Sequence, residues 1–326
     1  MSAESGSGAR SARHRRAAAA LSVLGVIVGV LGLVFVVRLL ARDWDEVTDA
    51  LADADGWLVG ASLMVGLGGM TWTSVVWHRI LAGFGARLPL VRMVHAYFVG
   101  QLGKYVPGGL WAVLSRAEIA VRHGAPRAAA YPSVGLSMAV TFLSALLFAG
   151  AASPWATTGD GAGRWALLAL PVGLVAIHPR VLRVGIAMSE RVFAGGGDVV
   201  VPSWGATMGL LVRQVPTWVL ISLSTWLLAE ALGYDAGLAT VAFAAPLSWF
   251  IGFVAIPVPG GVGVREAAFV GAVGSLGSTE AAAVAIAARL AFVAIDLLGA
   301  LLATLALVVA SRRGRGPDGR RHGPLR

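Results

Sequence analysis

Pro257-Val258-Pro259-Gly260-Gly261-Val262-Gly263 interrupts a long hydrophobic region of the chain, and Arg265 and Glu266 follow it almost at once. Lys104-Tyr105-Val106-Pro107-Gly108-Gly109 does the same 152 residues earlier, and Arg116 and Glu118 follow it. Interrupted hydrophobic segments at matching positions of two halves are the best sequence indication of a substrate site in a membrane transporter. The two interruptions therefore predict a broken helical hairpin in each half of a membrane protein.

The composition agrees with a membrane protein. The chain is 57% hydrophobic and only 13% charged, with a mean hydropathy of +0.77, whereas about a quarter of the residues are charged in a typical soluble domain. Several segments reach the roughly 20 apolar residues that a helix needs to cross a bilayer. We therefore expect an all-α, polytopic membrane helical bundle with six to eight spans, two of them broken or re-entrant hairpins.

The spans divide the chain into two tails and one transmembrane domain. We expect a basic cytoplasmic tail at 1–16, a transmembrane domain at 17–310 with halves at about 17–152 and 165–310, and a second basic cytoplasmic tail at 311–326. Full spans are predicted at 17–41, 57–78, 129–152, 165–178, 204–232 and 281–310. The hairpins fall at about 91–115 and 238–277.

The arginines predict the orientation, because cytoplasmic loops carry an excess of basic residues. Segments 1–16, 79–92, 115–128, 179–203 and 311–326 are rich in arginine, whereas 42–56 is acidic and 233–237 has no arginine. Both termini are then cytoplasmic, and the two hairpins enter from opposite sides, which makes the halves an inverted repeat. The alternative is that both arms of each hairpin cross fully, which gives seven to nine spans.

The net charge of +9 is compatible with nucleic-acid binding, but the arginines lie mostly in loops and tails, where they orient a membrane protein. The absence of cysteine excludes disulfides, thiolate metal sites and cysteine nucleophiles. The six histidines have no metal-ligand spacing, and no familiar catalytic or nucleotide-binding motif is present. We expect neither a metal nor another cofactor, and a non-enzymatic role is favoured.

Polar residues inside apolar sequence are the candidate substrate contacts, because charged groups at membrane depth usually face a partner or a cavity. An arginine fork can bind two phosphate oxygens, so we predict a cationic cavity for a phosphate headgroup, with the acids balancing the arginines. The hinge and cavity-shaping residues are Pro107, Gly108, Gly109, Pro259, Gly260, Gly261 and Gly263. The substrate-binding candidates are Gln101, Lys104, Arg116, Glu118, Arg213, Arg265, Glu266, Arg289 and Asp296.

A structural interpretation stands beside the functional one for several of these residues. Arg289 and Asp296 lie seven residues apart on one helix face and equally fit an internal ion-pair network that ties helices together. Arg116 also fits an ordinary charge of a cytoplasmic loop. Either interruption taken alone also fits a simple kink or a turn between two ordinary spans.

The motif residues themselves resemble a known family. The stretch from Gly100 to Trp111 resembles the first signature, and the stretch from Pro257 to Ala268 the second signature, of the lysylphosphatidylglycerol synthase transmembrane-region family, also called UPF0104. Arg289 is placed similarly to an arginine that recurs in that family. The resemblance covers about 17–310 and implies a polytopic membrane domain associated with anionic lipids, which translocates an aminoacylated phospholipid in the bifunctional members. The separate synthase domain of those members is not expected here.

These observations favour a flippase-like translocator of an anionic phospholipid or a polyprenyl-phosphate-linked headgroup in the bacterial cytoplasmic membrane. Its expected partners are membrane lipids and a separate lipid-modifying enzyme, with no nucleic acid. Two alternatives stay open. One is a membrane-embedded transferase that uses Glu118, Glu266 or Asp296 as a base, and the other is a scaffold subunit for a lipid-modifying enzyme.

Overall fold

Four long helices form the frame of the protein. The computed structural model describes residues 53–105, 111–156, 203–254 and 263–313, and these residues contain helices and no strand. The long helices are α3 (Gly56–Gly83), α6 (Arg127–Ala152), α9 (Trp204–Ala231) and α12 (Ser278–Arg313). Each is long and apolar enough to cross a membrane, and together they match four of the predicted spans. The predicted spans 17–41 and 165–178 lie outside the described residues.

Shorter helices occupy both predicted hairpins. The first hairpin contains α4 (Leu90–Gln101), the 3-10 turn η1 (Leu102–Tyr105) and α5 (Trp111–Arg122). The second contains α10 (Leu238–Val254) and α11 (Val264–Ala272). At about 1.5 Å per residue the 12-residue α4 and α5 reach about 18 Å each, well short of the roughly 30 Å hydrocarbon core. These lengths favour hairpins over fully crossing arms.

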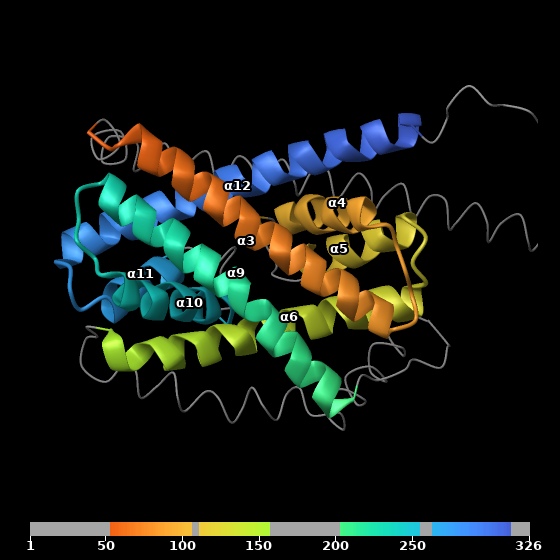
Figure 1. Ribbon diagram of the computed structural model, residues 1–326, viewed down its shortest axis with the longest axis horizontal. Helices are drawn as coiled ribbons and strands as arrows, with labels where there is room; N and C mark the ends of the chain where they lie inside the picture. The colour runs from red at the N-terminus through yellow and green to blue at the C-terminus, as the bar shows by residue number, and fades with distance from the viewer. Residues whose placement is uncertain (1–52, 106–110, 157–202, 255–262, 314–326) are drawn as a thin grey trace, which may run out of the picture.

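The two hairpins lie at opposite ends of the bundle (Figure 1). The α4–α5 hairpin occupies the end at which α3 ends and α6 begins, whereas α10 and α11 occupy the end at which α9 ends and α12 begins. The described chain thus runs twice through the order long helix, hairpin, long helix, with the hairpins pointing toward each other. This polytopic, all-helical architecture confirms the predicted fold class. The hinge positions Pro107, Gly108, Gly109, Pro259, Gly260 and Gly261 lie outside the described residues.

Helices α3 and α9 run side by side in opposite directions and join the two halves (Figure 1). The Ser62 hydroxyl donates to the Ser224 carbonyl at 2.8 Å, and the Ser224 hydroxyl donates to the Ser62 carbonyl at 2.9 Å. A side-chain Cβ at Gly66 would lie 2.9 Å from the Ser224 hydroxyl oxygen. Small residues and shared hydroxyls are what let membrane helices approach closely, so α3 and α9 pack tightly against each other.

Charge is segregated between the two ends of the bundle. Six arginines lie near the end that holds the α4–α5 hairpin: Arg79, Arg87, Arg92, Arg122, Arg127 and Arg312. The opposite end carries five acids, namely Asp53, Asp55, Glu230, Asp235 and Glu280, and no lysine or arginine among the described residues. We call the end with the α4–α5 hairpin the basic end and the opposite end the acidic end.

Candidate functional site

The first charged contact at the centre of the bundle joins the first hairpin to α12. The Lys104 ammonium lies 2.5 Å from the Asp296 carboxylate, and the Tyr105 hydroxyl donates to the same oxygen at 2.6 Å. The Asp296 side chain is fully buried, while that of Lys104 is 22% exposed. Both donors come from η1, immediately before the first Pro-Gly-Gly. The one lysine of the chain therefore neutralises the carboxylate that α12 brings to the centre.

Arg265, at the start of α11, reaches the same region by stacking on aromatic rings. Its guanidinium carbon lies 4.1 Å from the centre of the Trp249 ring and 5.6 Å from that of Phe292. The Lys104 ammonium lies 5.6 Å from the centre of the same Trp249 ring. The face of an aromatic ring attracts a cation through the ring quadrupole. The Trp249 ring therefore interacts with two cations, Lys104 of the first hairpin and Arg265 of the second.

Glu266 links α11 to α12. One of its carboxylate oxygens is in a close ion pair with Arg289 of α12. The other accepts a hydrogen bond at 2.7 Å from the backbone N–H of Gly263, which has a positive φ of 79° as the N-cap of α11. Glycine adopts this φ without strain. Arg289 and Asp296, predicted to share a helix face, thus pair with different hairpins, and each ties α12 to one of them.

Arg116, on α5, is the second arginine that stacks on a ring. It is 7% exposed, and its guanidinium carbon lies 4.6 Å from the centre of the Tyr97 ring on α4. Gln101, at the end of α4, is also buried at 5% exposure. Both lie inside the first hairpin, so Arg116 is not an exposed loop charge.

Four buried polar atoms in this region have no hydrogen-bond partner. They are Oε1 of Gln101, Nε of Arg116, Nε1 of Trp249 and Oδ1 of Asp296. Buried polar groups in folded proteins are nearly always satisfied by protein, water or ligand. Two of these atoms lie inside the first hairpin and two lie beside the Lys104 contacts, and each can hydrogen-bond to an ordered water or a ligand.

A small pocket opens beside Arg265 and Glu266. Its other walls are Thr225, Ala245, Ser248, Phe269, Ala285 and Ala288. The cavity volume of about 10 Å³ is close to the space that one water molecule needs. The pocket is therefore too small for a lipid headgroup in this arrangement, and admission of one requires α11 to move relative to its neighbours.

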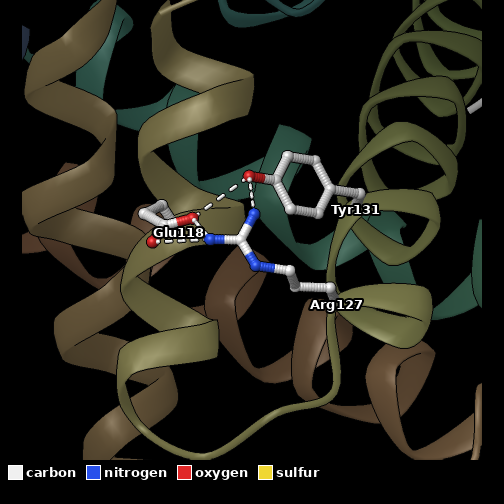
Figure 2. Close-up of polar contacts among 3 residues, drawn as sticks. All are labelled: Glu118, Arg127 and Tyr131. Carbon is white, nitrogen blue, oxygen red and sulfur yellow. Dashed lines mark hydrogen bonds and ion pairs between the residues drawn. The ribbon is translucent and has the colours of Figure 1, made fainter. Parts of the chain in front are cut away.

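Glu118 lies apart from these contacts, at the basic end. Its carboxylate accepts two hydrogen bonds from Arg127, at 3.0 and 3.1 Å, and one from the Tyr131 hydroxyl at 3.1 Å (Figure 2). These contacts join α5 to α6. Glu118 was predicted from the sequence to be a substrate contact, and the structure shows it in an ion pair with Arg127 that joins two helices.

Arg213 also lies away from the central contacts. It is exposed on α9, and its guanidinium donates to the Gly209 carbonyl of the same helix at 3.1 Å. Of the nine predicted substrate contacts, the structure brings seven to the region between the hairpins and α12: Gln101, Lys104, Arg116, Arg265, Glu266, Arg289 and Asp296.

The aromatic residues at the site were missed in the sequence. Tyr97, Tyr105, Trp249 and Phe292 contact the cations, yet only charged and amide side chains were singled out. A signal was present, since Tyr97 lies ten residues before Pro107 and Trp249 lies ten residues before Pro259. An aromatic residue at the same offset from both interruptions could have been found.

The described residues contain no group of three His, Asp or Glu side chains that could hold a metal ion. The expectation of no metal and no other cofactor stays a prediction.

The comparisons with known proteins identify the family. No curated protein sequence matches the chain significantly. The family model described as "Lysylphosphatidylglycerol synthase TM region" matches residues 22–303, which is most of the chain and includes the described helices up to the last ten residues of α12. Both signatures quoted from the sequence lie within the match. The protein therefore belongs to the lysylphosphatidylglycerol synthase transmembrane-region family.

Proposed function

We propose that the protein is a lipid translocator that moves an anionic phospholipid or a lipid-linked phosphate headgroup across the bacterial cytoplasmic membrane. The phosphate binds between the two hairpins, where Lys104, Arg116, Arg265 and Arg289 contact it, and the acyl or prenyl tails stay in the bilayer.

The observation that carries this proposal is an excess of positive charge on side chains that are buried (Arg116) or half-buried (Lys104, Arg265 and Arg289). Four cations surround two acids, Asp296 and Glu266, among the described residues at the meeting point of the hairpins. Uncompensated charge at membrane depth is costly, and phosphate is the anion that arginine forks match in geometry. An anionic headgroup neutralises the excess, and four unpartnered polar atoms nearby can accept or donate further hydrogen bonds.

The family supports the lipid assignment, because its name refers to the synthase of a phospholipid. The charge segregation supports an orientation in the membrane. Arginine-rich ends face the cytoplasm, so we place the basic end and both chain termini on the cytoplasmic side. The α4–α5 hairpin then opens toward the cytoplasm and the α10–α11 hairpin toward the outside.

The proposal is tested by headgroup accessibility in vesicles that contain the purified full-length protein. A phosphatidylglycerol with a fluorescent headgroup is present in both leaflets, and a membrane-impermeant reagent quenches the outer leaflet. We expect the protein to speed the loss of the protected fluorescence, and Arg265→Ala to abolish that acceleration. Arg122→Ala, an exposed arginine of α5, is the matched control and keeps the rate. Equal rates for the wild type and Arg265→Ala would contradict the proposal.

A further inference from the structure

Two histidines join the arms of the first hairpin at the basic end. His95 lies in the middle of α4, and His123 is the residue that follows α5. Nδ1 of His95 lies 3.0 Å from Nε2 of His123, and the two ring centres are 5.0 Å apart at an interplanar angle of 72°. Arg92, one turn earlier on α4, donates to the His123 carbonyl at 3.3 Å. Helix α4 therefore holds the end of α5 through both the ring and the backbone of His123.

This contact closes the open end of the hairpin. Deeper between the arms, Gly100 lies against Arg116, and the Ser115 hydroxyl donates to the Gly100 carbonyl at 2.7 Å. Arg116 and His123 are seven residues apart, so they lie on the same side of the second arm. Loss of the histidine contact would therefore weaken the closure of the same two arms that hold Arg116.

The histidine contact depends on how many protons the two rings carry. Two neutral imidazoles can form it, because one ring donates its N–H and the other accepts. One added proton preserves the contact, since an imidazolium still donates to a neutral imidazole. A second proton turns both nitrogens into donors and places two cations 3.0 Å apart. The rings therefore titrate as a pair, and the contact breaks at the second proton.

The surroundings oppose that second proton. Both rings are half-buried. Burial lowers the pKa of His123, and the nearby charges of His95 and Arg92 lower it further. The other ionisable groups of the basic end among the described residues are the arginines named above, His78 and Glu118, and Glu118 is already in an ion pair. A lowered histidine pKa means that the contact stabilises the hairpin at neutral pH and is lost as the pH falls.

We propose that the His95–His123 contact is a pH-sensitive latch at the basic end of the first hairpin, closed at neutral pH and released when both rings are protonated. Release lets α5 move away from α4 and loosens the hairpin. We further expect release to speed lipid movement, because the closed arrangement is too tight for a headgroup. This second part rests on the proposed function.

The latch is tested without lipid movement, by the distance between two spin labels in the purified full-length protein in detergent. The protein has no cysteine, so Leu90→Cys on α4 and Arg122→Cys on α5, both at exposed positions, carry the only labels. We expect a narrow distance distribution at neutral pH and a longer, broader one in acid, with a steep transition below about pH 6.5. Identical distributions at neutral and acid pH would overturn the latch.

Variants assign the response to the two rings. In His95→Gln and in His123→Gln the amide accepts from the remaining imidazolium, so neither variant should open in acid. His78→Gln is the matched control. His78 donates to the Leu88 carbonyl at 2.8 Å, a bond that a protonated ring keeps, so this variant should open as the wild type does. Melting temperatures at neutral pH verify that each variant is folded. Acid opening of both His95→Gln and His123→Gln would place the response elsewhere and overturn the latch.

A second measurement links the latch to lipid movement. The vesicle assay described above is run with the same pH on both sides of the membrane. We expect translocation by the wild type to be several-fold faster in acid than at neutral pH, and translocation by His123→Gln not to change. Opening of the labelled hairpin without a faster rate would overturn the link to transport and leave the latch standing. Acid opening with no translocation at any pH would contradict the proposed function and support the latch.

Discussion

At the scale of single residues, the burial of Asp296 explains why the one lysine of the chain lies where it does. A carboxylate with no exposed surface on α12 is tolerated because Lys104 and Tyr105 both reach it. Breaking such a pair costs more than removing both partners, since the remaining charge is buried without compensation. The pair therefore constrains α12 against the first hairpin.

We predict that Lys104→Met lowers the stability of the protein by about 3–5 kcal/mol, because Asp296 then remains alone. The double variant Lys104→Met with Asp296→Leu should recover most of that loss. Apparent melting temperatures in one detergent check both statements. A double variant as unstable as the single variant would show that the loss arises from packing and not from the unpaired carboxylate.

The Glu118–Arg127 pair should behave differently, because its side chains are 34% and 50% exposed. Exposed pairs contribute at most about 1 kcal/mol and are screened by salt. Arg127→Gln should therefore lower the melting temperature slightly at low salt and not at 1 M salt. A large loss that persists at high salt would mean that Arg127 acts by packing on Tyr131.

The charged residues of the site could be predicted from the sequence because a charge inside apolar sequence is conspicuous. Their partners could not, since Lys104 and Asp296 are almost 200 positions apart and meet only through the fold. Arg213 shows the limit of the argument. Like Arg265, Arg213 is a charged residue in apolar sequence. The sequence does not show which face of α9 it lies on, because that depends on how α9 packs against its neighbours, and the structure leaves Arg213 exposed.

At the scale of elements, the hairpins depend on close approach of their two arms. Gly100 on α4 lies against both the side chain and the backbone of Arg116, since a Cβ there would lie 2.7 Å from its Cα. Backbone cannot rotate away as a flexible side chain can. The stacking of Arg116 on Tyr97 in the first hairpin therefore depends on the absence of a side chain at Gly100.

Gly100→Ala should destabilise the protein by about 1–3 kcal/mol through overpacking and slow lipid translocation, since Arg116 is pushed off Tyr97. Gly135→Ala on α6, where nothing lies within 4 Å of the added Cβ, is the matched control. It should be neutral or stabilising by up to about 1 kcal/mol. Melting temperatures and the vesicle assay check the pair, and equal behaviour of the two variants would disprove the close-packing argument.

The long helices were predictable because about 20 apolar residues in a row have few other solutions, and four predicted spans agree with α3, α6, α9 and α12 to within a few residues at most boundaries. The hairpins required a second argument, because α10 is as apolar as a span. Proline and glycine supplied the break. Flanks rich in arginine placed both ends of the first hairpin on one side, and flanks without arginine placed both ends of the second hairpin on the other.

At the scale of the whole molecule, the segregation of charge makes the orientation measurable. The protein has no cysteine, so each introduced cysteine is the only thiol. In intact cells a membrane-impermeant maleimide should label Asp53→Cys and Asp235→Cys at the acidic end. Arg87→Cys and Arg312→Cys at the basic end should be labelled only after the membrane is opened. The reverse pattern would invert the proposed orientation, and labelling at both ends would indicate mixed insertion.

Glu266 has a consequence for motion. Its two oxygens perform separate tasks, one closing the first turn of α11 on Gly263 and the other holding Arg289 of α12. An incoming anion that draws Arg289 away frees only the second oxygen, so α11 keeps its first turn while its tether to α12 is released. Under the proposed function, loss of the Arg289 contact would let α11 turn without unwinding, and the pocket beside Glu266 would widen at little cost in backbone hydrogen bonds.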